Sequence, residues 1–165
     1  MHSEFEIQGP MGKGLCLSQA SRGVHIAITA GTGILAFVDL VARIHLQNIK
    51  ALPHDFEMLH PEFKLVLCCS FADRQSACCL DFCEKVAAHC IEHGFKNFEL
   101  VTRLSKISKK RWDQDWLGEL LEMPSVNNIT SRSVQQVWVC ATPTMNAQFD
   151  KWLHEKKMGF AIDIL

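Results

Sequence analysis

Apolar runs alternate with stretches of helical periodicity along most of the chain. Runs typical of buried strands occupy 24–28, 63–69, 98–102, 137–140 and 159–165. Between them, apolar residues recur every three or four positions, which predicts helices over 34–44, 76–93, 111–122 and 144–157. Strands that alternate with helices of this length indicate an α/β fold. We therefore predict a three-layer, doubly wound domain with a mainly parallel, five-stranded sheet.

Two glycines join the first predicted strand to the first predicted helix, in the segment Ala30-Gly31-Thr32-Gly33-Ile34. Glycines allow the backbone to approach a phosphate, and the start of a helix offers unpaired N–H groups and a positive dipole end. The segment is therefore a candidate anion site. A Gly-x-Gly sequence also occurs in ordinary tight turns, so both interpretations stay open at this point.

Four loops should meet at one edge of the predicted sheet. In parallel sheets, ligands bind beyond the carboxyl ends of the strands. The segments that follow the first four predicted strands are 30–33, 70–74, 102–105 and 140–145. We expect them to form one continuous rim.

Composition and charge narrow the class of protein. The chain has 165 residues, of which 48% are hydrophobic and 21% charged, and this fits one ordinary globular domain. Its formal charge of −1 gives no electrostatic case for binding nucleic acid or an anionic membrane. The apolar stretch over 23–44 is as long as a membrane span, which needs about 20 residues. It contains His25, Asp39 and Arg43, so we predict a strand and a helix there and no membrane segment.

Eight cysteines raise the question of disulfides or a zinc site, but their spacing favours neither. No Cys-x-x-Cys pair is present and no secretory leader is recognised. Cys79, Cys83 and Cys90 fall on one stripe of a predicted helix, where we expect them to be buried as small hydrophobic side chains. Reduced thiols predict a location in the cytoplasm or at the cytoplasmic face of a membrane.

A pair of histidines is a weaker candidate for metal binding. His89 and His93 lie four residues apart on the same predicted helix, with Cys90 beside them. Such a helical pair binds a metal ion only where further ligands converge on it. The pair alone does not meet this condition, so we predict no metal site.

Three short motifs occur in order and together resemble a known family. They are Gly9-Pro10-Met11-Gly12, Ala30-Gly31-Thr32-Gly33-Ile34 and Cys140-Ala141-Thr142-Pro143-Thr144-Met145. The NAD(P)H-binding half of the ferredoxin–NADP reductase superfamily carries Gly-Pro-x-Gly, Gly-Gly-Thr-Gly-Ile and Cys-Gly-Pro-Pro-x-Met. That superfamily includes cytochrome reductases, ferric-chelate reductases and NADPH oxidases. The resemblance covers nearly the whole chain.

The resemblance implies roles for individual residues. In this reading the phosphate loop, which holds the pyrophosphate of the dinucleotide, consists of Gly31, Thr32 and Gly33. Cys140 would be the catalytic residue, beside the nicotinamide ring, while Pro143 and Met145 would shape the adjacent helix start.

Two further residues would contact the adenosine ribose. By the resemblance, these are Ser70 and Arg74. A guanidinium can pair bidentately with a 2′-phosphate, which favours NADPH over NADH. Asp73 would have the opposite effect, because it would repel that phosphate. Without the resemblance, Arg74 is an ordinary solvated charge and Cys140 an ordinary packing residue at the end of a strand.

The resemblance also implies what the chain lacks. In the family, a barrel that holds FAD precedes this half and carries an Arg-x-Tyr/Phe-Ser segment, which is absent here; the chain has no tyrosine. We assign 1–20 to the exit strand of a flavin domain and the junction, and 21–165 to an NAD(P)H-binding domain. The implied function is delivery of hydride from NAD(P)H to an FAD held by a missing domain or a partner.

Departures from the family pattern keep other functions open. Ala30 replaces the first glycine of the phosphate loop, and Ala141 and Thr142 replace the Gly-Pro that follows the cysteine. These changes surround one site and favour a second reading, in which the chain is a degenerate, non-catalytic module kept for a structural or interaction role. A third reading is a domain that binds a mononucleotide or another phosphorylated ligand.

Overall fold

Five parallel strands form the centre of the molecule. The computed structural model describes residues 14–109, 112–122, 134–155 and 159–165. The strands are β1 (Gly23–Ala30), β2 (Phe63–Phe71), β3 (Phe98–Leu104), β4 (Val134–Cys140) and β5 (Ala161–Ile164). They are ordered β3-β2-β1-β4-β5, and every pairing is parallel. The predicted five-stranded parallel sheet is confirmed.

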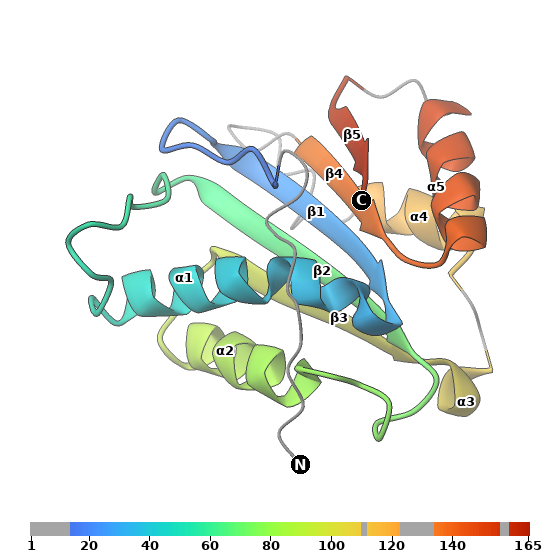
Figure 1. The fold of residues 1–165 in the computed structure, drawn as a ribbon, viewed down its shortest axis with the longest axis horizontal. Coiled ribbons are helices and arrows are strands. Elements are labelled where there is room, and N and C mark those ends of the chain that lie inside the picture. Colours follow the sequence, from blue (N-terminus) through green and yellow to red (C-terminus); the bar gives the residue numbers. More distant parts are fainter. Residues whose placement is uncertain (1–13, 110–111, 123–133, 156–158) are drawn as a thin grey trace, which may run out of the picture.

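Helices cover both faces of the sheet, as Figure 1 shows. The helical elements are η1 (Gly31–Phe37), α1 (Val38–Asn48), α2 (Leu80–Glu92), α3 (Ser105–Ser108), α4 (Gln114–Glu122) and α5 (Pro143–Glu155). One core lies between the sheet and the pair α1 and α2, and a second lies between the sheet and the pair α4 and α5. The three-layer, doubly wound architecture is therefore confirmed.

The central strands explain why the sequence contains unbroken apolar runs. Along β2, Leu65 and Leu67 face the core under α1 and α2, while Val66 and Cys68 face the core under α4 and α5. A strand that is buried on both faces has no polar side to alternate with its apolar one. All four side chains are fully buried.

Helices α2 and α4 both begin later than the periodicity predicts. The helix predicted over 76–93 begins at Leu80, because Ser76 closes a turn with Asp73 and Cys79 adopts a left-handed conformation with φ of 56°. The helix predicted over 111–122 begins at Gln114, because the Asp113 carboxylate accepts a hydrogen bond from the backbone N–H of Trp116 at 2.8 Å.

The cysteines follow the prediction with one exception. Cys83 and Cys90 are buried, but Cys79 is exposed, because its left-handed conformation takes it off the stripe of α2. All eight cysteines are free thiols.

The first part of the apolar stretch over 23–44 is β1, and the rest is helical. No helix in the described ranges is both long and apolar enough to cross a membrane. The motif at 9–12 lies outside the described residues, and the division of the chain at residue 20 stays a prediction.

A histidine is buried inside the sheet. His25 of β1 has only 4% of its surface exposed, and its ring centroid lies 4.7 Å from that of Phe63 and 5.5 Å from that of Trp138. Its Nδ1 lies 3.4 Å from the carbonyl oxygen of Gly23. Burial lowers the pKa of His25 below its usual 6.5, because the charged ring is poorly solvated there.

This buried ring makes stability depend on pH. The unfolded chain takes up a proton at His25 near pH 6.5, whereas the folded chain does so only at lower pH. The free energy of unfolding should therefore fall as pH drops below about 6.5, by at most about 1.4 kcal/mol per pH unit from this residue. We expect His25→Gln to flatten this slope in urea unfolding between about pH 7.5 and pH 5.5. His154→Gln, at an exposed histidine, is the control, and equal slopes in all three proteins would contradict the assignment.

Candidate functional site

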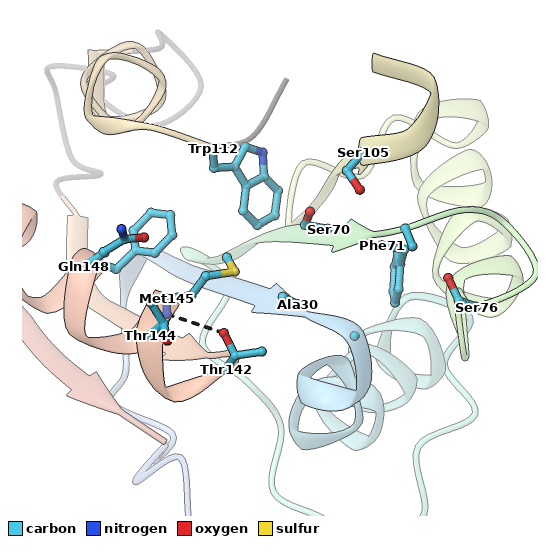
Figure 2. A pocket seen from close by; sticks show the side chains of 13 residues that line it. Ala30, Ser70, Phe71, Ser76, Ser105, Trp112, Thr142, Thr144, Met145 and Gln148 are labelled. Atoms are coloured by element: carbon cyan, nitrogen blue, oxygen red, sulfur yellow. Dashed lines mark hydrogen bonds between the residues drawn. The ribbon is translucent and has the colours of Figure 1, made fainter. Parts of the chain in front are cut away.

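The four predicted loops meet at the carboxyl edge of the sheet and enclose a pocket of about 510 Å³ (Figure 2). Its lining residues come from the ends of β1 and β2 and the segments that follow them, from α3, from the segment before α4, and from α5 and the residue just before it. They are Ala30, Gly31, Ser70, Phe71, Ala72, Ser76, Ser105, Trp112, Thr142, Thr144, Met145, Gln148 and Phe149. The predicted rim is confirmed.

The order of the strands explains why a pocket forms at this place. After β1 the chain moves to β2 on one side, and it later returns to β4 on the other side. The loops that leave β1 and β4 therefore diverge toward opposite faces of the sheet, and a crevice opens between them.

The glycine turn after β1 differs from the prediction in one respect. The α-helix predicted to resume at Ile34 begins only at Val38, because the intervening residues form the 3₁₀ helix η1. Ile34 and Phe37 are both buried and lie three residues apart, which is the repeat of a 3₁₀ helix. The backbone of Gly31 has φ of +56°, and a Cβ there would meet open space. This glycine lines the pocket, whereas no residue of α1 does.

The second glycine of the turn has a different role. A Cβ built on Gly33 would lie 1.9 Å from the carbonyl oxygen of Cys140 and 3.3 Å from its Sγ. Only glycine lets η1 pack this closely on the end of β4. The structure thus brings together Gly33 and Cys140, two predicted site residues, but neither lines the pocket. Thr32 is exposed and also lies outside the lining.

The thiol of Cys140 is half-buried. Burial raises its pKa above the usual value of 9.0, because a thiolate would be poorly solvated there. The side chain is therefore a neutral thiol at neutral pH and is not poised as a nucleophile.

The turn from β4 into α5 is built by hydrogen bonds. The N–H of Met145 donates to Thr142 Oγ1 at 3.4 Å, and Pro143 is the first residue of α5, where its missing N–H costs nothing (Figure 2). The predicted role of Pro143 in shaping the helix start agrees with this position. Met145 projects into the pocket.

Asn146 is a residue of this turn that the sequence reasoning missed. Its Oδ1 accepts a hydrogen bond from the N–H of Ala141 at 2.9 Å, and its Nδ2 donates to the carbonyl of Leu165 at 3.2 Å. It thereby ties the turn to the end of β5. An asparagine just inside a helix start is the only sequence signal, and it does not reveal these partners.

One wall of the pocket is aromatic. Trp112 is 7% exposed and stacks on Trp116, with ring centroids 4.5 Å apart and planes 10° apart. It faces Met145 across the pocket (Figure 2). Its Nε1 is buried and has no hydrogen-bond partner among the described residues. Figure 2 shows the six-membered ring of the indole, and not this nitrogen, turned toward Met145. Sequence reasoning assigned Trp112 no role beyond a place in the helix predicted over 111–122, and in the structure it precedes α4.

The two residues predicted to contact the ribose separate in the structure. Ser70 lines the pocket, but Arg74 does not. The guanidinium of Arg74 donates to Glu84 Oε1 at 2.9 Å and to Asp81 Oδ1 at 3.0 Å. These partners raise the pKa of Arg74, Glu84 contributing most, and Arg74 in turn lowers the pKa of Glu84.

The neighbouring acid is paired as well. Lys106 of α3 lies 2.6 Å from Asp73 Oδ2, and this ion pair is the largest cause that lowers the pKa of Asp73 to about 2. Both cations beside the pocket are therefore paired with acids, and no lining residue that the structure describes is charged. An anion in this pocket would be held by backbone N–H groups and hydroxyls.

The sheet order, the layers and the pocket together define the fold of the NAD(P)-binding domains of ferredoxin–NADP reductase-like proteins. The cytochrome b5 reductase domain of Ulva prolifera nitrate reductase superposes with a TM-score of 0.56 and 12% identity, over 87% of this chain and 49% of that one. The CS-b5R domains of human Ncb5or, in the NAD+ form, give a TM-score of 0.55 and 16% identity, over 86% and 36%.

A third solved structure is a mutant ferredoxin–NADP+ reductase from Plasmodium falciparum in complex with 2'P-AMP. It gives a TM-score of 0.52 and 15% identity, over 87% of this chain and 53% of that one. At these identities the likeness establishes the fold, and this chain spans about half or less of each protein. No protein-family model matches the chain, and a search of curated proteins finds no significant match.

The two glycines of the turn should respond differently to alanine. We expect Gly33→Ala to lower the free energy of unfolding by about 3 kcal/mol, because the new methyl meets the Cys140 carbonyl. Gly31→Ala should cost only about 1 kcal/mol, because its methyl meets open space and the loss comes from the left-handed backbone. Urea unfolding measures both values, and equal losses would contradict the close approach of η1 to β4.

Proposed function

We propose that this chain is the NAD(P)H-binding domain of a flavin-dependent oxidoreductase. In this role it delivers hydride from NAD(P)H to an FAD held by a missing domain or a partner. The observation that carries the proposal is the pocket of about 510 Å³ at the carboxyl edge of the sheet, where the glycine turn of β1 meets the loops after β2 and β4.

Similarity to known reductases supports the choice of ligand. The human Ncb5or structure is an NAD+ form, and the Plasmodium reductase is in complex with 2'P-AMP. Both share their fold with this chain. A cytoplasmic location, or one at the cytoplasmic face of a membrane, belongs to the same proposal and is consistent with eight free thiols.

The lining of the pocket suits a dinucleotide. The exposed backbone of Gly31 lets a phosphate approach, and hydroxyls of Ser70 and Thr142 stand at the same edge. Trp112 and Met145 provide apolar surface for a ring. The chemistry of hydride transfer belongs to the cofactors, so the chain's part is to bind and orient the dinucleotide. The catalytic role of Cys140 stays a prediction, because its neutral thiol packs near Gly33 and does not line the pocket.

Calorimetric titration with NADH and NADPH tests the proposal. We expect saturable binding to the purified chain, and a loss of at least about tenfold in Gly31→Asn. Asparagine tolerates the left-handed backbone, so this variant should fold while its side chain fills the open space at the pocket. Gly94→Asn is the matched control, because Gly94 also has a positive φ and open space but lies outside the pocket.

The outcomes separate the proposal from its alternative. Binding that Gly31→Asn abolishes and Gly94→Asn retains would support a working dinucleotide site. Absence of binding up to millimolar concentrations would favour the degenerate module. The ion pairs of Arg74 with Asp81 and Glu84 favour that second candidate, because they occupy the group expected to contact the ribose.

Arg74 also governs the proposed preference for NADPH. A 2′-phosphate would have to replace Glu84 at the guanidinium. We expect Glu84→Gln to raise the affinity for NADPH relative to NADH by about two- to fivefold, the range of an exposed ion pair. Glu62→Gln removes the same charge next to the amino end of β2 and is the control. An unchanged ratio of the two affinities in Glu84→Gln would contradict a role for Arg74 in this choice.

A further inference from the structure

A cluster of histidines lies at the edge of the sheet opposite the pocket. His45 is near the end of α1, His89 is in the last turn of α2, and His93 directly follows α2. The two helices contact each other and run side by side (Figure 1). The ring centroid of His89 lies 5.1 Å from that of His45 and 4.2 Å from that of His93.

Three of the side chains in this region offer ligand atoms to one point. One nitrogen each of His89 and His93 and one carboxylate oxygen of Glu92 all lie within 4.8 Å of one another. Ligands about 2.0–2.2 Å from a tetrahedral zinc ion are roughly 3.4 Å apart. Glu92 and His93 are exposed, so small rotations of these two side chains would bring the three atoms into range.

Two imidazole nitrogens of this cluster lack hydrogen-bond partners among the described residues. Nε2 of His89 and Nδ1 of His45 are buried and have no hydrogen bond among the described residues. A buried polar atom without a partner is costly, and an imidazole nitrogen is satisfied equally by a hydrogen bond or by a metal ion. Nδ1 of His93 lies 3.1 Å from the carbonyl oxygen of His89. A hydrogen bond donated there leaves Nε2 of His93 as the nitrogen with a free lone pair.

We propose that His89, Glu92 and His93 bind a divalent transition-metal ion, with His45 as a further imidazole that links the site to α1. Zn²⁺ fits best, because histidine nitrogens and a carboxylate are its usual ligands. Bound there, the ion joins the last turn of α2 to α1 and stabilises the face of the sheet that these helices cover. The buried thiol of Cys90 has Asn48 as its neighbour at 3.5 Å and is not part of the site.

This site meets the condition that the sequence alone left unmet. A helical pair of histidines needs further ligands, and the fold places Glu92 beside the pair, while the ring of His45 from the neighbouring helix stands edge-on to His89. The site lies far from the dinucleotide pocket and does not depend on the proposed function.

Zinc titration of the full chain by calorimetry tests the proposal. We expect one site per chain, and a loss of at least about tenfold in affinity in His89→Ala and in His93→Ala. His154→Ala is the matched control, because His154 also has Nδ1 near the carbonyl four residues earlier, at 2.8 Å from Asp150, but belongs to no such cluster. Equal affinity in His89→Ala and the parent would overturn the site, as would a loss in His154→Ala.

Two further measurements test which atoms bind the ion and whether zinc stabilises the fold. The absorption spectrum of the Co²⁺ form should show nitrogen and oxygen ligands, and a thiolate charge-transfer band would overturn the proposal by placing the ion on cysteines. Zinc should also raise the melting temperature of the parent and not that of His89→Ala. His45→Ala should weaken zinc binding as well, and unchanged affinity in that variant would overturn the link to α1.

Discussion

The close contact between Gly33 and the carbonyl of Cys140 is the constraint on which the site depends. A single Cβ at Gly33 would overlap that carbonyl. Therefore η1 can pack directly against the end of β4 only while residue 33 has no side chain. This contact sets where the backbone of Gly31 leaves β1 and where the turn into α5 begins. The pocket is therefore a product of backbone packing, and its side chains line a space that the backbone has already defined.

Much of the fold follows from the sequence because burial is periodic. β1 and β2 are covered on both faces, so their unbroken apolar runs could be recognised, and the alternation with helices predicted the layers and the rim. The start of α2 could not be predicted, because it depends on a turn at Asp73 and on the left-handed backbone of Cys79. Likewise η1 replaces the first turns of a helix, since Ile34 and Phe37 suit both periods.

The candidate site was less predictable than the fold because its residues act through distant partners. Nothing in the sequence shows that Arg74 has a partner, yet its guanidinium donates a hydrogen bond to Glu84, ten residues further along the chain. Trp112 lies in a segment whose periodicity suggests only packing, and its place beside the pocket arises from the route of the chain after α3. The histidines behave in the same way, since α1 supplies His45 to a group that begins on α2. Pairings across elements follow from topology, which local patterns do not encode.

The stacked indoles of Trp112 and Trp116 have an optical consequence. Two parallel rings with centroids 4.5 Å apart are close enough for their electronic transitions to couple, so the pair should give a near-ultraviolet circular dichroism signal sensitive to ring placement. Because Trp112 also forms a wall of the pocket, any molecule that displaces it alters that signal. The protein thus carries a built-in spectroscopic reporter at the edge of the sheet where the pocket lies, and it needs no added label.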